Sequence, residues 1–347
     1  MHAVRLHRAG AVIGTLAAAC LLVSSPAYAK RGPGGSDGGA KTSGTRSGNT
    51  LESRITYSGR MGGVNGTSTG NVAPVGNWNP PACWYEPVSA KDFQNQVESQ
   101  YAEVVNDPRQ PNYAKAATGQ FRNTYKDDKY KNYNLDKADE GNWWVAVQDP
   151  NRLDDPGAFT CDKLPFWVQN GDTPAVQNAI TPQVLAELAY NRILLPDTKV
   201  TLAPQDVTKV NLPTWAWLDP SAFKPVQVTA SLNVAGLNIQ ATTTAQPVSL
   251  KLQPGTADAE TYPASGECAI NNDGSIGESY TRGKSDQAPP CGIKYLRSSG
   301  NGTYNLQATI TWRINWIGTG GAGGKLPDGT FGATQAVTVQ EIQALNR

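Results

Sequence analysis

Histidine sets the first limit on the chemistry of this 347-residue chain. Its two histidines, His2 and His7, lie within the first 29 residues, which we expect to be removed as a signal peptide. The remaining chain then has no imidazole for a Ser-His-Asp or Cys-His arrangement, or for a His-ligated metal. Catalysis would have to use carboxylates, Lys, Tyr or a bound metal.

Carboxylates come next, because two of them flanking one bond can hydrolyse a glycoside. Three adjacent pairs occur: Asp127-Asp128, Asp139-Glu140 and Asp154-Asp155. Neighbours in sequence rarely provide the required geometry, so we interpret these pairs as solvated loop charge. A carboxylate-dependent polysaccharide hydrolase remains the alternative function.

Several further patterns match functional motifs only by their letters. Asn271 to Glu278 offers oxygen ligands for calcium but lacks the full spacing of a calcium loop. Gly318 to Gly323 spells a dinucleotide fingerprint, but Lys325 to Gly329 predicts a turn where a helix is needed. Gly66 to Gly70 spells a nucleophile elbow, and Ser221 to Lys224 a serine–lysine pair between prolines. We predict no catalytic residue, cofactor or metal.

Cysteine content agrees with export. Cys20 lies in the expected signal peptide, and an even number remains: Cys83, Cys161, Cys268 and Cys291. Four cysteines in an exported chain indicate two disulfides with three possible pairings. We prefer Cys83–Cys161 and Cys268–Cys291, because each pair falls within one expected domain. The absence of C-x-x-C does not favour zinc.

The stretch NPPACWYEP, residues 79–87, is interpreted as a structural clasp rather than a reactive site. Prolines restrict the backbone on both sides of Cys83, and Trp84 and Tyr85 can bury large areas beside a disulfide. Glu86 would then need a partner such as an arginine or a backbone amide.

Nine tryptophans offer faces that could stack on sugar rings. The candidate ligand-contact aromatics are Trp84, Tyr85, Trp215 and Trp217. Packing in the core is the competing interpretation for each of them.

The N-terminus predicts export. A charged head, an apolar run over 9–23 and Ala27-Tyr28-Ala29 predict a signal peptide over 1–29, cleaved near Ala29, and a secreted protein. Lipidation at Cys20 is an alternative. No later stretch is apolar enough to span a membrane. The 30 basic and 29 acidic residues form no basic stripe, so nucleic acid is not expected as a partner.

Composition then divides the chain. Residues 30–77, rich in Gly, Ser, Thr and Asn, predict a flexible tether, with ordered structure starting near Trp78. Residues 78–200 predict a mixed, mainly helical domain linked by a disulfide. Apolar spacing and cap residues there indicate helices over 90–106, 112–125 and after Thr181-Pro182, with a strand over 143–147.

In residues 201–347 the apolar residues recur with a period of two. Tyr304 to Trp316 alternates apolar and polar residues, which is typical of a half-buried strand. Shorter strands are expected over 226–230, 248–252 and 337–339. The fold class predicted is therefore α+β, with an antiparallel sandwich after the helical domain.

The phrases WNPPACWYEP, GNWWVAV, VNLPTWAWLD and YNLQATITWRINW together resemble a family of actinobacterial (Streptomyces-like) secreted proteins of unknown function. The resemblance covers Trp78 to Arg347 and implies a C-terminal PKD or immunoglobulin-like sandwich. Gly302-Thr-Tyr304 fits the late strand of such domains, whereas Leu250 to Gly255 replaces their W-x-x-G-D-G turn. The family supplies no catalytic residues to transfer.

These observations favour a secreted, non-enzymatic binding or structural protein. Its expected partners are cell-wall polysaccharide or another secreted protein, and a role as scaffold of a larger exported assembly is a further hypothesis. The oligomeric state is not determined by the sequence.

Overall fold

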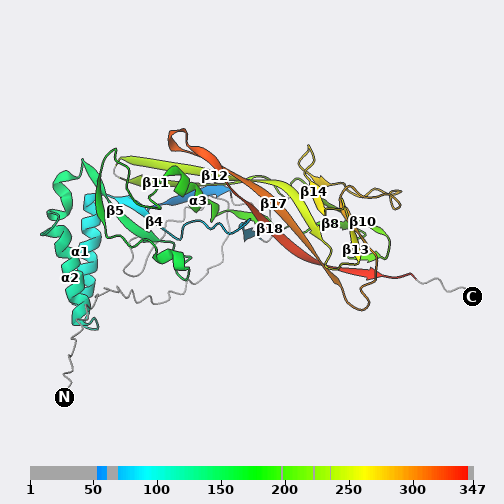
Figure 1. Cartoon of the computed structure of the whole chain (residues 1–347), viewed down its shortest axis with the longest axis horizontal. Coiled ribbons are helices and arrows are strands. Elements are labelled where there is room, and N and C mark those ends of the chain that lie inside the picture. The colour runs from blue at the N-terminus through cyan, green and yellow to red at the C-terminus, as the bar shows by residue number, and fades with distance from the viewer. Residues whose placement is uncertain (1–52, 61–68, 197, 222, 235, 343–347) are drawn as a thin grey trace, which may run out of the picture.

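A computed structural model describes residues 53–60, 69–196, 198–221, 223–234 and 236–342. The molecule is elongated, with its longest strands running along its length (Figure 1). The helices α1 (Ala90–Asn106) and α2 (Asn112–Lys126) lie at one end, and β10 (Pro213–Leu218) lies at the other. The expected signal peptide and Cys20 lie outside the described residues, as does most of the motif from Gly66 to Gly70.

An eight-stranded sheet forms the spine of the molecule. Its order is β1-β11-β12-β17-β18-β3, with β14 added to β12 and β9 added parallel to β18. The bounds are β1 Thr56–Arg60, β3 Ala73–Pro74, β9 Val207–Lys209, β11 Val226–Val234, β12 Leu237–Gln253, β14 Glu267–Ala269, β17 Tyr304–Gly318 and β18 Gly323–Gln340. Strand β17 buries alternate residues as its pattern predicts, because successive side chains point to opposite faces of the sheet.

Two irregularities allow these long strands to continue. Pro247 has no N–H to donate, and the register between β12 and β17 shifts between Pro247 and Ser249. A second shift lies between Trp312 and Ile314, opposite β18. The turn predicted over Lys325 to Gly329 is therefore wrong: these residues continue β18 through a bulge after the short 3₁₀ helix η3 (Thr319–Gly321).

A second sheet lies at the end of the molecule away from the helices and packs against the spine there (Figure 1). It contains β8 (Thr201–Ala203), β10, β13 (Ala259–Tyr262), β15 (Ile276–Gly277) and β16 (Gly292–Tyr295). Tyr295 of β16 stacks on Tyr304 of β17 with ring centroids 5.3 Å apart. The disulfide Cys268–Cys291 joins β14 of the spine to the residue before β16. Packing and a covalent bond both hold the two layers together.

A three-stranded sheet lies at the helical end. It consists of β4 (Cys83–Val88), β5 (Gly141–Gln148) and β6 (Phe166–Gln169). Phe93 of α1 stacks on Trp143 of β5 with ring centroids 4.6 Å apart, and Tyr125 of α2 meets the same indole edge-on. The helices therefore bury their apolar faces against this sheet.

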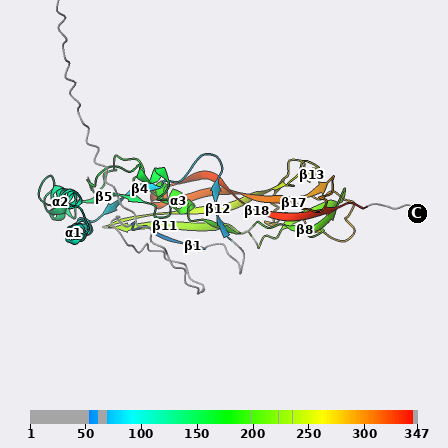
Figure 2. The same ribbon diagram turned by 90° about the horizontal axis from the view of Figure 1, so that it is seen from below.

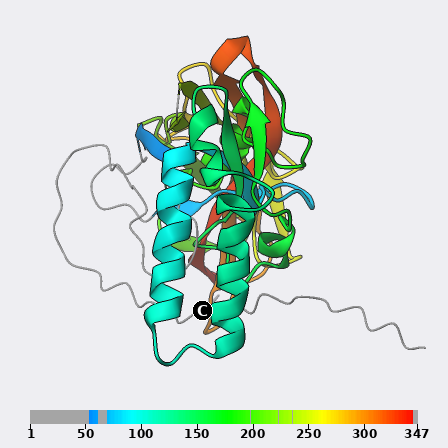
Figure 3. The ribbon, with the colours of Figure 1, turned by 90° about the vertical axis from the view of Figure 1, so that its left-hand side faces the viewer.

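The helices α1 and α2 form a hairpin (Figure 3). Polar side chains also link the two helices. Arg122 donates to Glu98 at 2.7 Å, and the Tyr133 hydroxyl, from the 3₁₀ helix η1 (Asn132–Lys137), donates to the same carboxylate. The hydrogen bond from Arg122 is the main cause that lowers the pKa of Glu98 to about 2. The helix ends agree with the sequence, because Ser89 caps α1 and Asp107-Pro108 follows it.

Helix α3 (Pro182–Tyr190) connects the helical end to the spine. Thr181 caps it by accepting from the Val184 N–H, as its sequence predicts. Thr243, fully buried in β12, donates its hydroxyl hydrogen to the Ala186 carbonyl at 2.8 Å. Viewed from below, α3 lies over the β11 and β12 end of the spine (Figure 2). One continuous hydrophobic core therefore crosses the division predicted between residues 200 and 201.

The predicted fold class is wrong. Of the described residues, 42% lie in strands and 19% in helices, and these residues contain no mainly helical N-terminal domain. The helices are additions to a β architecture. For β12 the sequence indicated only the fragment 248–252, because much of this strand, including Thr242, Thr243 and Thr244, lacks an apolar alternation, although tertiary packing makes it one strand of 17 residues.

The predicted tether over residues 30–77 is also partly wrong. Strands β1, β2 (Thr69–Asn71) and β3 lie within it, and β2 pairs with β7 (Leu194–Pro196). Two side chains of this segment, Ile55 and Val72, are buried in the core. Such short strands are stabilised by hydrogen bonds to neighbouring strands and by packing against them. Local composition therefore underestimates how stable these strands are.

In the described part of the chain, no helix is both long and apolar enough to cross a membrane. The structure confirms both preferred disulfides, Cys83–Cys161 and Cys268–Cys291.

Loop length predicts how much each disulfide stabilises the fold. Cys83 and Cys161 are separated by 78 residues and Cys268 and Cys291 by 23, so chain entropy gives about 4.5 and about 3.4 kcal/mol, respectively. We expect the paired Cys→Ser variant of the first bridge to lose more free energy of unfolding in urea than that of the second. The reverse order would contradict the entropic account.

Candidate functional site

Residues just before β1 and within β4 converge on one buried carboxylate. Glu86 of β4 is fully buried and accepts three hydrogen bonds. The Arg54 backbone N–H donates at 2.9 Å, while the Ser53 hydroxyl and the Trp84 indole N–H each donate at 3.1 Å. The stretch around Cys83 is thus a clasp, and the partner expected for Glu86 includes a backbone amide.

Burial changes the acidity of this carboxyl group. Desolvation raises the pKa of Glu86 to about 7, against the opposing effect of the hydrogen bonds from Trp84, Arg54 and Ser53. At neutral pH the group therefore lies near its midpoint of protonation. Both of its oxygens are already bound, so it is placed to hold the strand β1 rather than to contact a ligand.

Three of the four candidate ligand-contact aromatics are buried. Trp84, Tyr85 and Trp215 are 1%, 4% and 2% exposed, and Trp217 is half-buried. The Tyr85 hydroxyl accepts a hydrogen bond from the Lys163 N–H, which fixes it inside the fold. These four side chains therefore form no exposed row on which a sugar could stack.

A polar pocket of about 450 Å³ lies instead beside β1. Its walls come from β1, from Asn71 in β2, from the loop after β5 and from the end of α3. Leu194 and Val228 add apolar surface. Because its segments are far apart in sequence, the pocket exists only in the folded chain.

An ion pair and an aromatic ring form the polar wall of this pocket. Asp149 is 4% exposed, and its Oδ1 lies 3.7 Å from Nη2 of Arg192. The Arg192 guanidinium also lies over the Tyr57 ring, 5.0 Å from its centroid. Burial raises the pKa of Tyr57 above its ordinary value, which Arg192 opposes, so the phenol is neutral at physiological pH.

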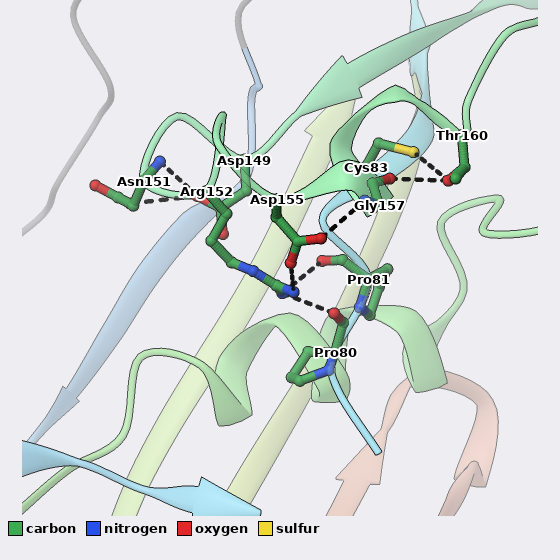
Figure 4. Close-up of polar contacts among 9 residues, drawn as sticks. All are labelled: Pro80, Pro81, Cys83, Asp149, Asn151, Arg152, Asp155, Gly157 and Thr160. Atoms are coloured by element: carbon green, nitrogen blue, oxygen red, sulfur yellow. Dashed lines mark hydrogen bonds and ion pairs between the residues drawn. The ribbon is translucent and has the colours of Figure 1, made fainter. Parts of the chain in front are cut away.

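Polar contacts of Arg152 and Asp155 fix the loop that carries Asp149 (Figure 4). Arg152 donates to the Pro80 carbonyl at 2.7 Å and forms an ion pair with Asp155. Asp155 in turn accepts from the Gly157 N–H and caps the 3₁₀ helix η2 (Pro156–Phe159). Since the Cys83–Cys161 disulfide follows directly, the loop is fixed at both ends.

The other predicted ionic sites do not assemble. Asp127, Asp128, Asp139, Glu140 and Asp154 are exposed, as expected for loop charge. In the proposed calcium stretch, Asp273 accepts from Ser275, while Glu278 pairs with Lys284. The described residues contain no group of three or more His, Cys, Asp or Glu placed to hold a metal.

The sequence did not identify Tyr57, Asp149 and Arg192 as a group. Tyr57 lies in the predicted tether, and Asp149 and Arg192 follow a strand and a helix without a motif. The one available sign was Asp149-Pro150 directly after a buried strand, where loop residues commonly carry function.

Comparison of the chain with known protein families, characterised proteins and solved structures found no match in any of the three. The resemblance to actinobacterial secreted proteins and to PKD or immunoglobulin-like domains therefore gains no support from these comparisons.

The titration of Glu86 predicts a specific pH dependence of stability. Its pKa is about 7 when folded and near 4.5 when unfolded, so the free energy of unfolding should fall by about 3 kcal/mol as the pH rises from 4.5 to 8. We expect Glu86→Gln to remove most of this slope in urea unfolding series.

Glu103→Gln, which changes an exposed carboxyl of α1, is the matched control and should keep the slope. Because the pKa of Glu98 is lowered, its titration changes the stability mainly below pH 4.5, outside the range measured for Glu86. A wild-type stability that is flat or rises over this range would refute the assignment.

Proposed function

We propose that this chain is an extracellular, non-enzymatic binding protein that uses the polar pocket beside β1 to recognise a component of the cell surface. The observation that carries the proposal is the pocket itself. It combines a nearly buried carboxylate, a guanidinium and a neutral phenol in a cavity of about 450 Å³. Concave sites of this size with a few convergent polar groups are typical of ligand binding.

Export is part of the same proposal. Two disulfides are compatible with an oxidising compartment. The charged and apolar N-terminal sequence, ending in Ala27-Tyr28-Ala29, and the resemblance to secreted actinobacterial proteins support the same location.

The geometry favours binding over the alternative, a carboxylate-dependent hydrolase. Glycoside hydrolysis needs two carboxyl groups flanking one bond. Asp149 is the only acidic residue among the described residues that line the pocket. Glu86 has the raised pKa expected of a general acid, but it is fully buried and both of its oxygens are occupied.

Retention on insoluble cell-wall polymers tests the proposal. We expect the wild-type protein to be retained on purified peptidoglycan, chitin or cellulose, and Arg192→Gln to be retained at least about ten-fold less, because a hydrogen bond to a charged group contributes about 1.5–3 kcal/mol. Arg313→Gln, which changes an exposed arginine of β17, should behave as the wild type.

Equal retention of the wild-type protein and Arg192→Gln, or no retention of either, would contradict the proposal. Circular dichroism and urea unfolding of each variant exclude loss of fold as the cause.

A further inference from the structure

Resting on this proposed function, we infer that the pocket beside β1 binds a neutral sugar through two neighbouring hydroxyl groups, which bridge Asp149 and Arg192.

Asp149 has an acceptor to offer. Oδ1 accepts from the Asn151 backbone N–H at 3.0 Å and from the Asn151 side-chain amide at 3.3 Å, and it is also the atom nearest to Arg192. None of these contacts uses Oδ2. An ionised carboxylate accepts at both oxygens, so a nearly buried carboxylate that lines a cavity can take hydrogen from a ligand hydroxyl there.

Arg192 has donors to offer. Its 3.7 Å separation from Asp149 exceeds a hydrogen-bond distance, so the pair is electrostatic. The guanidinium carbon lies 5.0 Å from the Tyr57 ring centroid, and none of the hydrogen bonds found among the described residues is donated by the Arg192 side chain. The side chain is 35% exposed, so its N–H groups are accessible from solvent.

A hydroxyl group both donates and accepts, so two adjacent hydroxyls match one acceptor beside one donor. The first donates to Asp149 while the second accepts from Arg192. Ser58, Asn71 and Asn151 are exposed at the same pocket and also combine donor and acceptor groups.

Charge balance favours a neutral ligand. The charge of Asp149 is offset by Arg192, and that of Arg152 by Asp155. Among the described residues that line the pocket, an anionic ligand would find no surplus cation and would be repelled by Asp149. A cation would be repelled by Arg192. A sugar without ionised groups avoids both costs.

Titration of soluble probes tests the inference. The neutral sugars are glucose, galactose, mannose and N-acetylglucosamine. The probes with ionised groups are the anion glucuronate and the zwitterion alanine, and 2-(hydroxymethyl)tetrahydropyran supplies a ring without neighbouring hydroxyls. Dissociation constants are measured by calorimetry or by ligand-observed NMR. We expect at least one neutral sugar to bind more tightly than all three controls.

Arg192→Gln should weaken that sugar about ten- to hundred-fold, and Arg313→Gln should not. Asp149→Asn should also weaken it. Asp149 accepts a hydrogen bond from the Asn151 N–H in its own loop, so its replacement could prevent folding. In that case the result for Arg192→Gln decides the test.

The inference is overturned if no neutral sugar binds, if glucuronate or alanine binds more tightly, or if a folded Arg192→Gln variant binds as the wild type. Retention on cell-wall polymers that depends on Arg192, combined with no sugar binding, would reject the sugar while the proposed function stands.

Discussion

The buried carboxyl group of Glu86 is the constraint on which the arrangement of this molecule depends. A carboxyl group removed from water needs hydrogen-bond donors, and the chain supplies them from Ser53, Arg54 and Trp84. Two of these donors precede β1, so satisfying Glu86 fixes where β1 begins. Strand β1 then pairs with β11 along the edge of the spine and places Tyr57 beside the pocket.

The remaining pocket walls are also fixed by specific contacts. Arg152 ties the loop after β5 to the Pro80 carbonyl, and the disulfide at Cys161 closes that loop. Helix α3 is anchored on the spine by the hydrogen bond from Thr243, and Arg192 follows its C-cap at the pocket. A polar pocket can thus be rigid although its residues lie on loops and an edge strand, because each segment is bound to the core behind it.

Sequence patterns predicted the helices and strands that are specified by residues within their own segment. Ser89 and Thr181-Pro182 marked helix starts, and the alternation after Tyr304 marked a long strand. Both disulfide pairings followed from placing each pair within one domain.

The patterns failed where stability comes from distant partners. Strand β1 has few apolar residues and is held by β11 and by Glu86, so its sequence indicated a tether. The polar threonines of β12 gave no strand pattern, although Thr243 is buried against α3. Asp149 and Arg192 are brought together only by the packing of β5, α3 and the spine, which no spacing rule includes.

An NMR titration of the Glu86 side-chain carboxyl carbon tests the central claim most directly. The account predicts a midpoint near pH 7, with the Arg54 amide and the Trp84 indole proton changing at the same midpoint because both donate to this group. A midpoint near 4.5, or a titration that leaves these two protons unchanged, would show that the carboxyl group is solvated and does not hold β1 in place.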